Sequence, residues 1–248
     1  MPTANQESCE VNNSLDDISL IVDAAIFDLD GTLIDSSDTY FSVIEEILKR
    51  LELPLVPREV LLEKMREGVE SWGDLFPAES ESWKKRLTKE AGTLFKELAP
   101  RMLQQNLKLI PGTPETLRQI FAKGIKIGLV TLTHLKYLED KLYPLKKAGI
   151  ADLIESIICI EDIPRVKPAP DSLIECAKRM SVLMDKCVYI GDSDIDIKAG
   201  RAAGMKTVGV LTGMDNYETL KKEGPDLIID SVADLLKIIE PCGQAGSS

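Results

Sequence analysis

Two aspartates, Asp28 and Asp30, directly follow an apolar run and precede a Gly-Thr pair. Side chains two positions apart on an extended chain project from the same face, so the two carboxylates are expected to point the same way. Their mutual repulsion needs a cation to offset it. The pair therefore predicts a cation between the carboxylates with one aspartate acting as a nucleophile, and Gly31 permits the tight turn that follows.

A second acidic group lies in the segment "YIGDSDIDIKAG". Asp192 ends an apolar run, and Asp194 and Asp196 follow at the expected start of a helix. Capping of that helix by Asp192 or Ser193 is an alternative interpretation. A calcium-binding loop of the Asp-x-Asp-x-Asp kind is excluded, because its sixth position is Ile197 instead of glycine.

Two further polar residues come after apolar runs. Thr131 offers a hydroxyl that can donate to a phosphate oxygen, although threonine is also a common strand residue. Lys167 stands among Pro164, Pro168 and Pro170, which stiffen the loop and would hold its ammonium in one place. A solvated surface lysine is the alternative at that position.

Short apolar runs alternate with amphipathic segments through the second half of the chain. This alternation predicts a doubly wound α/β fold with a parallel sheet covered on both faces. Ligands of such sheets bind outside the carboxyl ends of the strands, where the polar groups described above fall. The strands are expected at 24–29, 125–132, 156–161, 187–192, 206–211 and 226–230, and the helices at 134–148, 170–181, 194–203, 215–223 and 231–240.

Helical spacing of apolar residues dominates the stretch after the first strand, in 40–51, 58–67 and 81–107. The sequence thus predicts an all-helical domain inserted into the α/β core. The expected boundaries are a flexible leader at 1–20, the core at 21–37 and 109–240, the helical insertion at 38–108 and a flexible tail at 241–248.

Composition excludes several classes of protein. The net charge of −11 over 248 residues, without a basic stripe, disfavours nucleic-acid binding. No stretch reaches the roughly 20 apolar residues of a membrane span. One histidine leaves little basis for a zinc site or a Ser-His-Asp triad, and five scattered cysteines favour a reducing, cytoplasmic setting. The first twenty residues do not have the pattern of a secretory signal.

The chain resembles the haloacid dehalogenase-like (HAD) hydrolases. "DLDGTLID" (28–35) matches the first motif of that family, Thr131 the second, Lys167 before "PAPD" the third and "GDSDIDIKAG" (191–200) the fourth. The resemblance implies a Rossmann-like core with a helical cap, of the branch that includes phosphoglycolate phosphatase and β-phosphoglucomutase relatives. It covers about residues 22 to 240.

The resemblance also implies roles for the acidic residues. Asp28 would be the nucleophile that forms an aspartyl-phosphate, and Asp30 the general acid and base. Mg²⁺ would be held by the Asp28 carboxylate, the Asp30 backbone carbonyl and Asp192. Asp196 would orient its neighbours from behind them.

The remaining motif residues would contact the phosphoryl group. Thr131 and Lys167 would bind its oxygens, assisted by backbone N–H groups of the Gly31 turn and of Leu132. Leu132 stands where many relatives have a small polar residue, which removes one side-chain contact. His134 is expected at the surface, at a helix start.

The expected activity is Mg²⁺-dependent hydrolysis of a phosphate monoester, with a small phosphorylated metabolite as partner and either a monomer or a dimer as the assembly. A phosphomutase of the β-phosphoglucomutase type would share every core residue and differ only in the cap. In the cap, the candidates for substrate recognition are Arg66, Gly68 and Trp72. The alternative for Trp72 is that it packs in the core of the cap.

Four other classes of protein are alternatives. A phosphonate-cleaving enzyme would need a cap lysine, for which only Lys64 lies nearby. A phospho-accepting receiver domain also uses a strand-end aspartate with Mg²⁺, but lacks Asp-Gly-Thr and is about half as long. A catalytically silent binding protein is disfavoured by the intact motifs, and a dinucleotide-binding domain by the lack of G-x-G-x-x-G.

Overall fold

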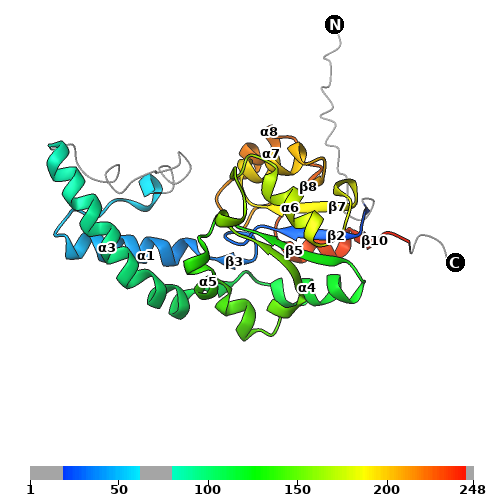
Figure 1. Ribbon diagram of the computed structural model, residues 1–248, viewed down its shortest axis with the longest axis horizontal. Coiled ribbons are helices and arrows are strands. Elements are labelled where there is room, and N and C mark those ends of the chain that lie inside the picture. Colours follow the sequence, from blue (N-terminus) through cyan, green and yellow to red (C-terminus); the bar gives the residue numbers. More distant parts are fainter. Residues whose placement is uncertain (1–18, 62–79, 244–248) are drawn as a thin grey trace, which may run out of the picture.

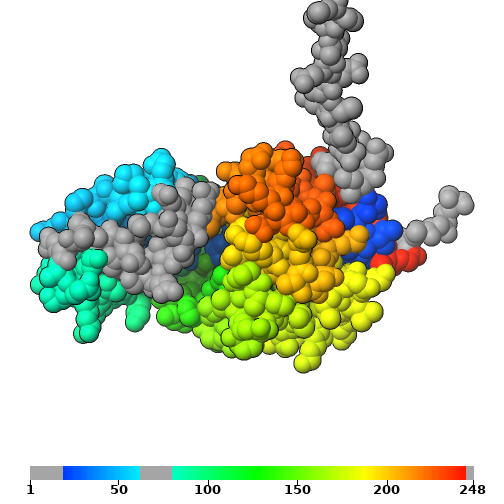
Figure 2. Space-filling view, turned by 90° about the horizontal axis from the view of Figure 1, so that it is seen from above, coloured from blue at the N-terminus to red at the C-terminus, as the bar shows by residue number. Residues whose placement is uncertain are grey.

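The computed structural model describes residues 19–61 and 80–243. Figure 1 shows an α/β core at one end of an elongated molecule and two long helices, α1 and α3, at the other. The space-filling view from above shows the same division, with the helical part beside the core (Figure 2). Within the described residues, no helix is both long and apolar enough to cross a membrane.

A six-stranded sheet with all neighbours parallel forms the centre of the core, in the order β6-β5-β2-β7-β8-β9. The chain enters at β2, builds outward on one side through β5 and β6, and then returns to the other side of β2 with β7. The carboxyl end of β2 is therefore the switch point of the sheet. The strands are β2 Ala24–Phe27, β5 Lys126–Val130, β6 Ile154–Ile158, β7 Cys187–Gly191, β8 Lys206–Val210 and β9 Leu227–Ile229.

Helices cover both faces of this sheet. Ala25 and Phe27 of β2 belong to one buried apolar cluster, and Ala24 and Ile26 belong to a second cluster on the opposite face, as the alternation of a strand requires. The first cluster takes residues from α4 and α5, and the second from α6 and α7. The helices are α4 Thr113–Ala122, α5 Leu135–Lys147, α6 Asp171–Arg179, α7 Asp194–Ala202 and α8 Tyr217–Lys222.

The helical insertion leaves the core through a narrow connection. β3 (Ile34–Asp35) runs out to α1 (Ser37–Arg50), and α3 (Glu81–Asn106) leads back into β4 (Lys108–Leu109), which pairs antiparallel with β3. The doubly wound α/β fold with an inserted helical cap is thus confirmed. Most of the helix expected at 58–67 lies outside the described residues.

The carboxyl-terminal segment differs from the prediction. In place of a helix over 231–240, the chain forms a 3₁₀ segment at Val232–Lys237 and then strand β10, Ile239–Pro241, which pairs in parallel with β1, Leu20–Val22. An extended chain buries Ile239 completely opposite Leu20, whereas a continued helix would not follow β1. Leu20 and Pro241 therefore belong to paired strands and not to a flexible leader or tail.

Candidate active site

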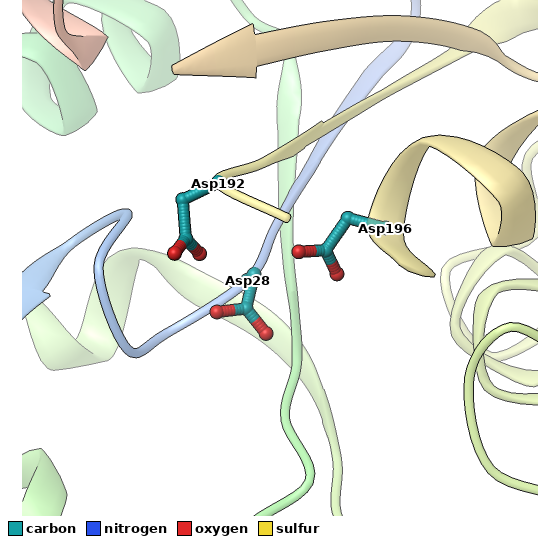
Figure 3. A group of neighbouring side chains, drawn as sticks. All are labelled: Asp28, Asp192 and Asp196. Atoms are coloured by element: carbon teal, nitrogen blue, oxygen red, sulfur yellow. The ribbon is translucent and has the colours of Figure 1, made fainter. Parts of the chain in front are cut away.

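The carboxyl ends of three neighbouring strands, β5, β2 and β7, converge at one place. Asp28 follows β2, Thr131 follows β5, and Asp192 follows β7. Figure 3 shows the carboxylates of Asp28, Asp192 and Asp196 directed toward one another, with Asp196 reaching in from the first turn of α7. Each offers an oxygen that lies within 4.8 Å of the others, and all three side chains are buried. The acidic groups predicted at two strand ends thus meet at the switch point of the sheet, and Thr131 ends the strand beside Asp28.

Lys167 provides the positive charge of this cluster. Its Nζ donates to Asp28 Oδ1 at 2.6 Å and to Asp196 Oδ1 at 2.6 Å. It also donates to the hydroxyl of Tyr189 at 3.1 Å, and that hydroxyl donates to Asp196 Oδ1 at 2.8 Å. Burial alone would lower the pKa of Lys167, but Asp196 and Asp28 outweigh it and the pKa is raised. The lysine is therefore a fixed, buried ammonium; the bond between it and Pro168 is cis.

Asp196 has partners on both of its oxygens. Oδ1 accepts from Lys167 and Tyr189, while Oδ2 accepts from the backbone N–H of Ser193 at 3.2 Å and from its hydroxyl at 2.5 Å. The bond from the Ser193 N–H to Oδ2 is one half of the capping box that begins α7. Ser193 is therefore the N-cap residue of α7, as the alternative interpretation predicted. Asp196 contributes to both the helix start and the site, because its Oδ2 binds the Ser193 N–H and its Oδ1 binds Lys167.

Asp192 is held by two segments, the turn that follows Asp30 and the loop that follows β8. Its Oδ2 accepts from the backbone N–H of Met214 at 2.7 Å and its Oδ1 from the Thr32 hydroxyl at 3.3 Å. Gly31 has φ +77°, and a Cβ there would collide with the Asp192 carboxylate; a Cβ at Gly213 would do the same. Glycine at these positions lets the backbone approach the carboxylate closely.

The buried carboxylates carry more negative charge than Lys167 balances. Burial raises the pKa of Asp28 well above its ordinary value, against the opposing effect of Lys167, and the nearby Asp196 and Asp192 raise it further. Burial, with Asp196, raises the pKa of Asp192 to about 7. Clustered carboxylate oxygens of this kind are the ligands that Mg²⁺ prefers, and a divalent cation would remove the excess charge. The residues present therefore fit a magnesium ion.

Thr131 is buried at the end of β5, and its Oγ1 lies 2.8 Å from Thr133 Oγ1 and accepts from the Thr133 N–H at 3.1 Å. The side chain of Leu132 between them is exposed. His134 occupies the N-cap position of α5 and lies 2.8 Å from Glu161 at the surface. The prediction that His134 is a surface residue at a helix start is confirmed.

Two residues beside Asp30 escaped the sequence analysis. The Nζ of Lys141 in α5 lies 2.5 Å from Asp30 Oδ2 and 5.0 Å from the ring centroid of Tyr40 in α1. Neither residue belongs to a motif. One signal was available, because Lys141 falls on the apolar stripe of its helix with Leu138 and Leu145, where a charged side chain needs a buried partner.

The cap candidates Arg66, Gly68 and Trp72, and the nearby Lys64, lie outside the described residues. Their proposed part in reading the substrate stays a prediction.

A cluster of carboxylates around a buried lysine at the switch point of a parallel sheet, with a helical insertion after the first strand of that sheet, defines a hydrolase of the HAD type. The sequence model of the haloacid dehalogenase-like hydrolases matches residues 25–210, and the chain belongs to this family.

Known proteins resemble the chain over nearly its whole length. The phosphoglycolate phosphatase of Escherichia coli (strain K12) is 30% identical in an alignment of length 234 that covers 85% of this chain and 89% of that protein. The structure of a predicted phosphoglycolate phosphatase from Haemophilus somnus has a TM-score of 0.70 at 25% identity and covers 87% of this chain and 97% of its own. A HAD family hydrolase from Deinococcus radiodurans R1, with bound phosphate and sodium, shares the fold with a TM-score of 0.68 at 24% identity, covering 86% of this chain and 93% of its own.

Proposed function

We propose that the protein is a Mg²⁺-dependent phosphatase that hydrolyses a small phosphate monoester through an aspartyl-phosphate on Asp28. The observation that carries this proposal is the 2.6 Å contact between Lys167 Nζ and Asp28 Oδ1 at the carboxyl end of the central strand. An aspartate held there beside a fixed ammonium can approach a phosphoryl dianion, which an isolated carboxylate would repel. Relatives named phosphoglycolate phosphatase, at modest identity, support the same reaction class.

The proposed reaction has two displacements at phosphorus. In the first, an Asp28 oxygen attacks, the ester P–O bond breaks, and Asp30 gives its proton to the departing oxygen. In the second, Asp30 takes a proton from water, the water oxygen attacks phosphorus, and the bond to Asp28 breaks. The products are the alcohol and inorganic phosphate, and both aspartates return to their starting forms.

The Asp28 carboxylate, the Asp30 backbone carbonyl and Asp192 would hold the magnesium ion. When bound, the ion supplies positive charge that offsets the repulsion between the nucleophile and the phosphoryl oxygens. Asp196 is not needed as a ligand in this assignment, because its two oxygens already bind Lys167 and Ser193. Its proposed role is to keep Lys167 in place.

The proposed phosphoryl contacts come from Thr131, Lys167, the turn that contains Gly31 and the backbone N–H of Leu132. The N–H of Gly31 itself is already used, because it donates to the carbonyl of Ile34 at 2.8 Å. Thr131 stands at the end of β5, beside the strand that carries Asp28. The exposed side chain of Leu132 leaves only its N–H for this purpose. Donors fixed before the substrate arrives stabilise developing charge without reorganising.

A screen of phosphorylated metabolites with the purified full-length protein and Mg²⁺ tests the proposal, with 2-phosphoglycolate, sugar phosphates and nucleotides among the compounds. We expect steady release of inorganic phosphate from at least one compound, which Asp28→Asn abolishes. Asp152→Asn, at an exposed position, is the matched control and should keep full activity. Full activity of Asp28→Asn would reject the proposal. Isomerisation of a sugar phosphate without phosphate release would favour the phosphomutase. Retention of one phosphoryl group per chain would favour the receiver-like protein.

The cytoplasmic location and the oligomeric state stay predictions. Cys159, Cys176 and Cys187 are free and buried, in keeping with the expected reducing setting.

A further inference from the structure

A second buried ammonium lies beside the proposed active site, outside every motif. Lys141 is in the middle of α5, and its side chain is only 5% exposed. Its Nζ donates to Asp30 Oδ2 at 2.5 Å, whereas the neighbouring stripe positions Leu138, Leu142 and Leu145 pack in the apolar core. A lysine at a core position of an amphipathic helix costs free energy unless it is paired.

Asp30 and Tyr40 compensate that cost. The ring of Tyr40 faces the Lys141 ammonium at 5.0 Å, within the range of a cation–π contact. The carboxylate partner of this lysine, Asp30, is the proposed acid and base.

The contact leaves the two oxygens of Asp30 in different surroundings. Oδ2 is bound to Lys141, while Oδ1 is buried and has no hydrogen-bond partner among the described residues. A carboxylate anchored by one oxygen cannot turn freely about its Cβ–Cγ bond. Asp30 therefore keeps Oδ1 as its free oxygen. Buried polar atoms normally have a hydrogen-bond partner, so Oδ1 is available to a group of the substrate or to water.

The cap helices help to place this lysine. Tyr40 of α1 stacks on Phe95 of α3 with ring centroids 6.5 Å apart, and Phe95 meets Tyr137 of α5 edge-on at 6.1 Å. Tyr137 lies one helical turn before Lys141, so this aromatic row joins both cap helices to the helix that carries the lysine. The position of the ammonium is thus fixed from the core and from the cap together.

We propose that Lys141 is a positioning residue for Asp30, holding Oδ2 so that Oδ1 faces the departing alcohol oxygen and the entering water. The inference rests on the proposed function of Asp30. It adds no covalent step: Oδ1 carries the proton before the first displacement and exchanges it with those oxygens, while Oδ2 goes on accepting from Lys141. Without the lysine the carboxyl group can rotate away, and protonation of the leaving oxygen becomes inefficient.

Two aryl phosphates of similar size separate this role from a structural one. 4-Nitrophenolate departs readily without a proton, whereas phenol, like a tyrosine side chain with a pKa of about 10, needs one. For Lys141→Met we expect kcat/KM on phenyl phosphate to fall by about 10²-fold, the lower range for general acid catalysis, and on 4-nitrophenyl phosphate by less than about threefold. KM should change little for either substrate, since the proposed phosphoryl contacts remain.

The controls distinguish the possible failures. Lys147→Met, at an exposed position of the same helix, should change neither substrate. Lys141→Gln, whose uncharged amide lies one bond short of the position of the ammonium and does not hold Oδ2, serves in the same comparison if the methionine variant does not fold, and the same selective loss is expected. Equal losses on both aryl phosphates, or no loss on either, would overturn the proposal.

Asp30→Asn measured beside these variants separates the inference from its premise. Selective loss on phenyl phosphate in Asp30→Asn but not in the Lys141 variants overturns the role of Lys141 alone. Full activity of Asp30→Asn on both substrates overturns the proposed function of Asp30, and the inference with it.

Discussion

At the scale of single residues, the site is an arrangement of buried charges that constrain one another. Lys167 binds Asp28 and Asp196 at the same distance, 2.6 Å, and is almost completely buried between them. An ion pair away from water has a stronger Coulomb attraction than a surface pair. That attraction offsets the cost of desolvation only if the remaining hydrogen-bonding groups of both partners are satisfied. The hydroxyl groups of Tyr189 and Ser193 donate the further hydrogen bonds to Asp196.

Replacing Lys167 tests this arrangement. For Lys167→Ala we expect kcat/KM for 4-nitrophenyl phosphate to fall by about 10³-fold, because the charge that lets Asp28 approach the phosphoryl group is gone. Steady-state assays normalised to the folded fraction, measured by circular dichroism, provide the value. Lys186→Ala, at an exposed position, should stay within experimental error. A loss below twofold at position 167 would count against the assigned role.

At the scale of elements, strand order places the chemistry. β5 and β7 flank β2, so residues more than 60 positions apart in sequence end at one edge of the sheet. The paired strands β1 and β10 then tie the two ends of the core together, and Cys242 N–H extends the pairing by donating to the carbonyl of Val22 at 3.1 Å. This small sheet lies away from the carboxyl ends that carry the site and serves the stability of the core.

The pair of isoleucines in that small sheet gives a matched test. Ile239 is fully buried and Ile21, on the partner strand, is 44% exposed. For Ile239→Ala we expect the free energy of unfolding to fall by about 2–5 kcal/mol, because buried methyl groups are lost and a cavity remains. For Ile21→Ala the change should stay within about 0.5 kcal/mol. Urea unfolding measures both, and equal effects would mean that β10 is not packed as described.

At the scale of the whole molecule, charge and metal binding are linked. The chain carries a net charge of −11 and also buries three carboxylates at one point. The pKa of Asp192 is raised to about 7 in the folded protein without metal. Between about pH 4 and pH 7 the folded protein therefore keeps a proton on Asp192 that the unfolded chain, with an ordinary aspartate pKa, has released. Stability without metal therefore falls as pH rises from about 4 to 7, and a metal ion must displace that proton below pH 7.

Thermal unfolding in Mg²⁺ tests this linkage. We expect millimolar Mg²⁺ to raise Tm more at about pH 8 than at about pH 6, because one pH unit below the pKa of Asp192 costs about tenfold in apparent metal affinity. KCl at equal ionic strength controls for screening of the net negative charge. An increase of Tm that is the same at both pH values would contradict the proposed metal site.

The sequence by itself determined the class of fold and the chemistry of its motifs. Alternating apolar runs and amphipathic segments dictate a parallel sheet with covered faces, and the polar residues after those runs must then gather at its carboxyl edge. Asp28, Thr131 and Asp192 could be predicted for that reason, since each directly follows a strand with a recognisable apolar pattern. Lys167 was found by the prolines around it. His134 was placed by the same local logic, at the start of its helix.

Only the tertiary structure decided which distant groups touch. Lys141 pairs with Asp30 across 111 positions, and no local pattern specifies that meeting. Ile239 adopts a strand because β1 offers a parallel partner, a tertiary effect that outweighs a helical pattern. Sequence periodicity indicates which face of a helix or strand is buried. It does not indicate which element packs against that face, because contacts between segments far apart in the chain depend on how the elements pack.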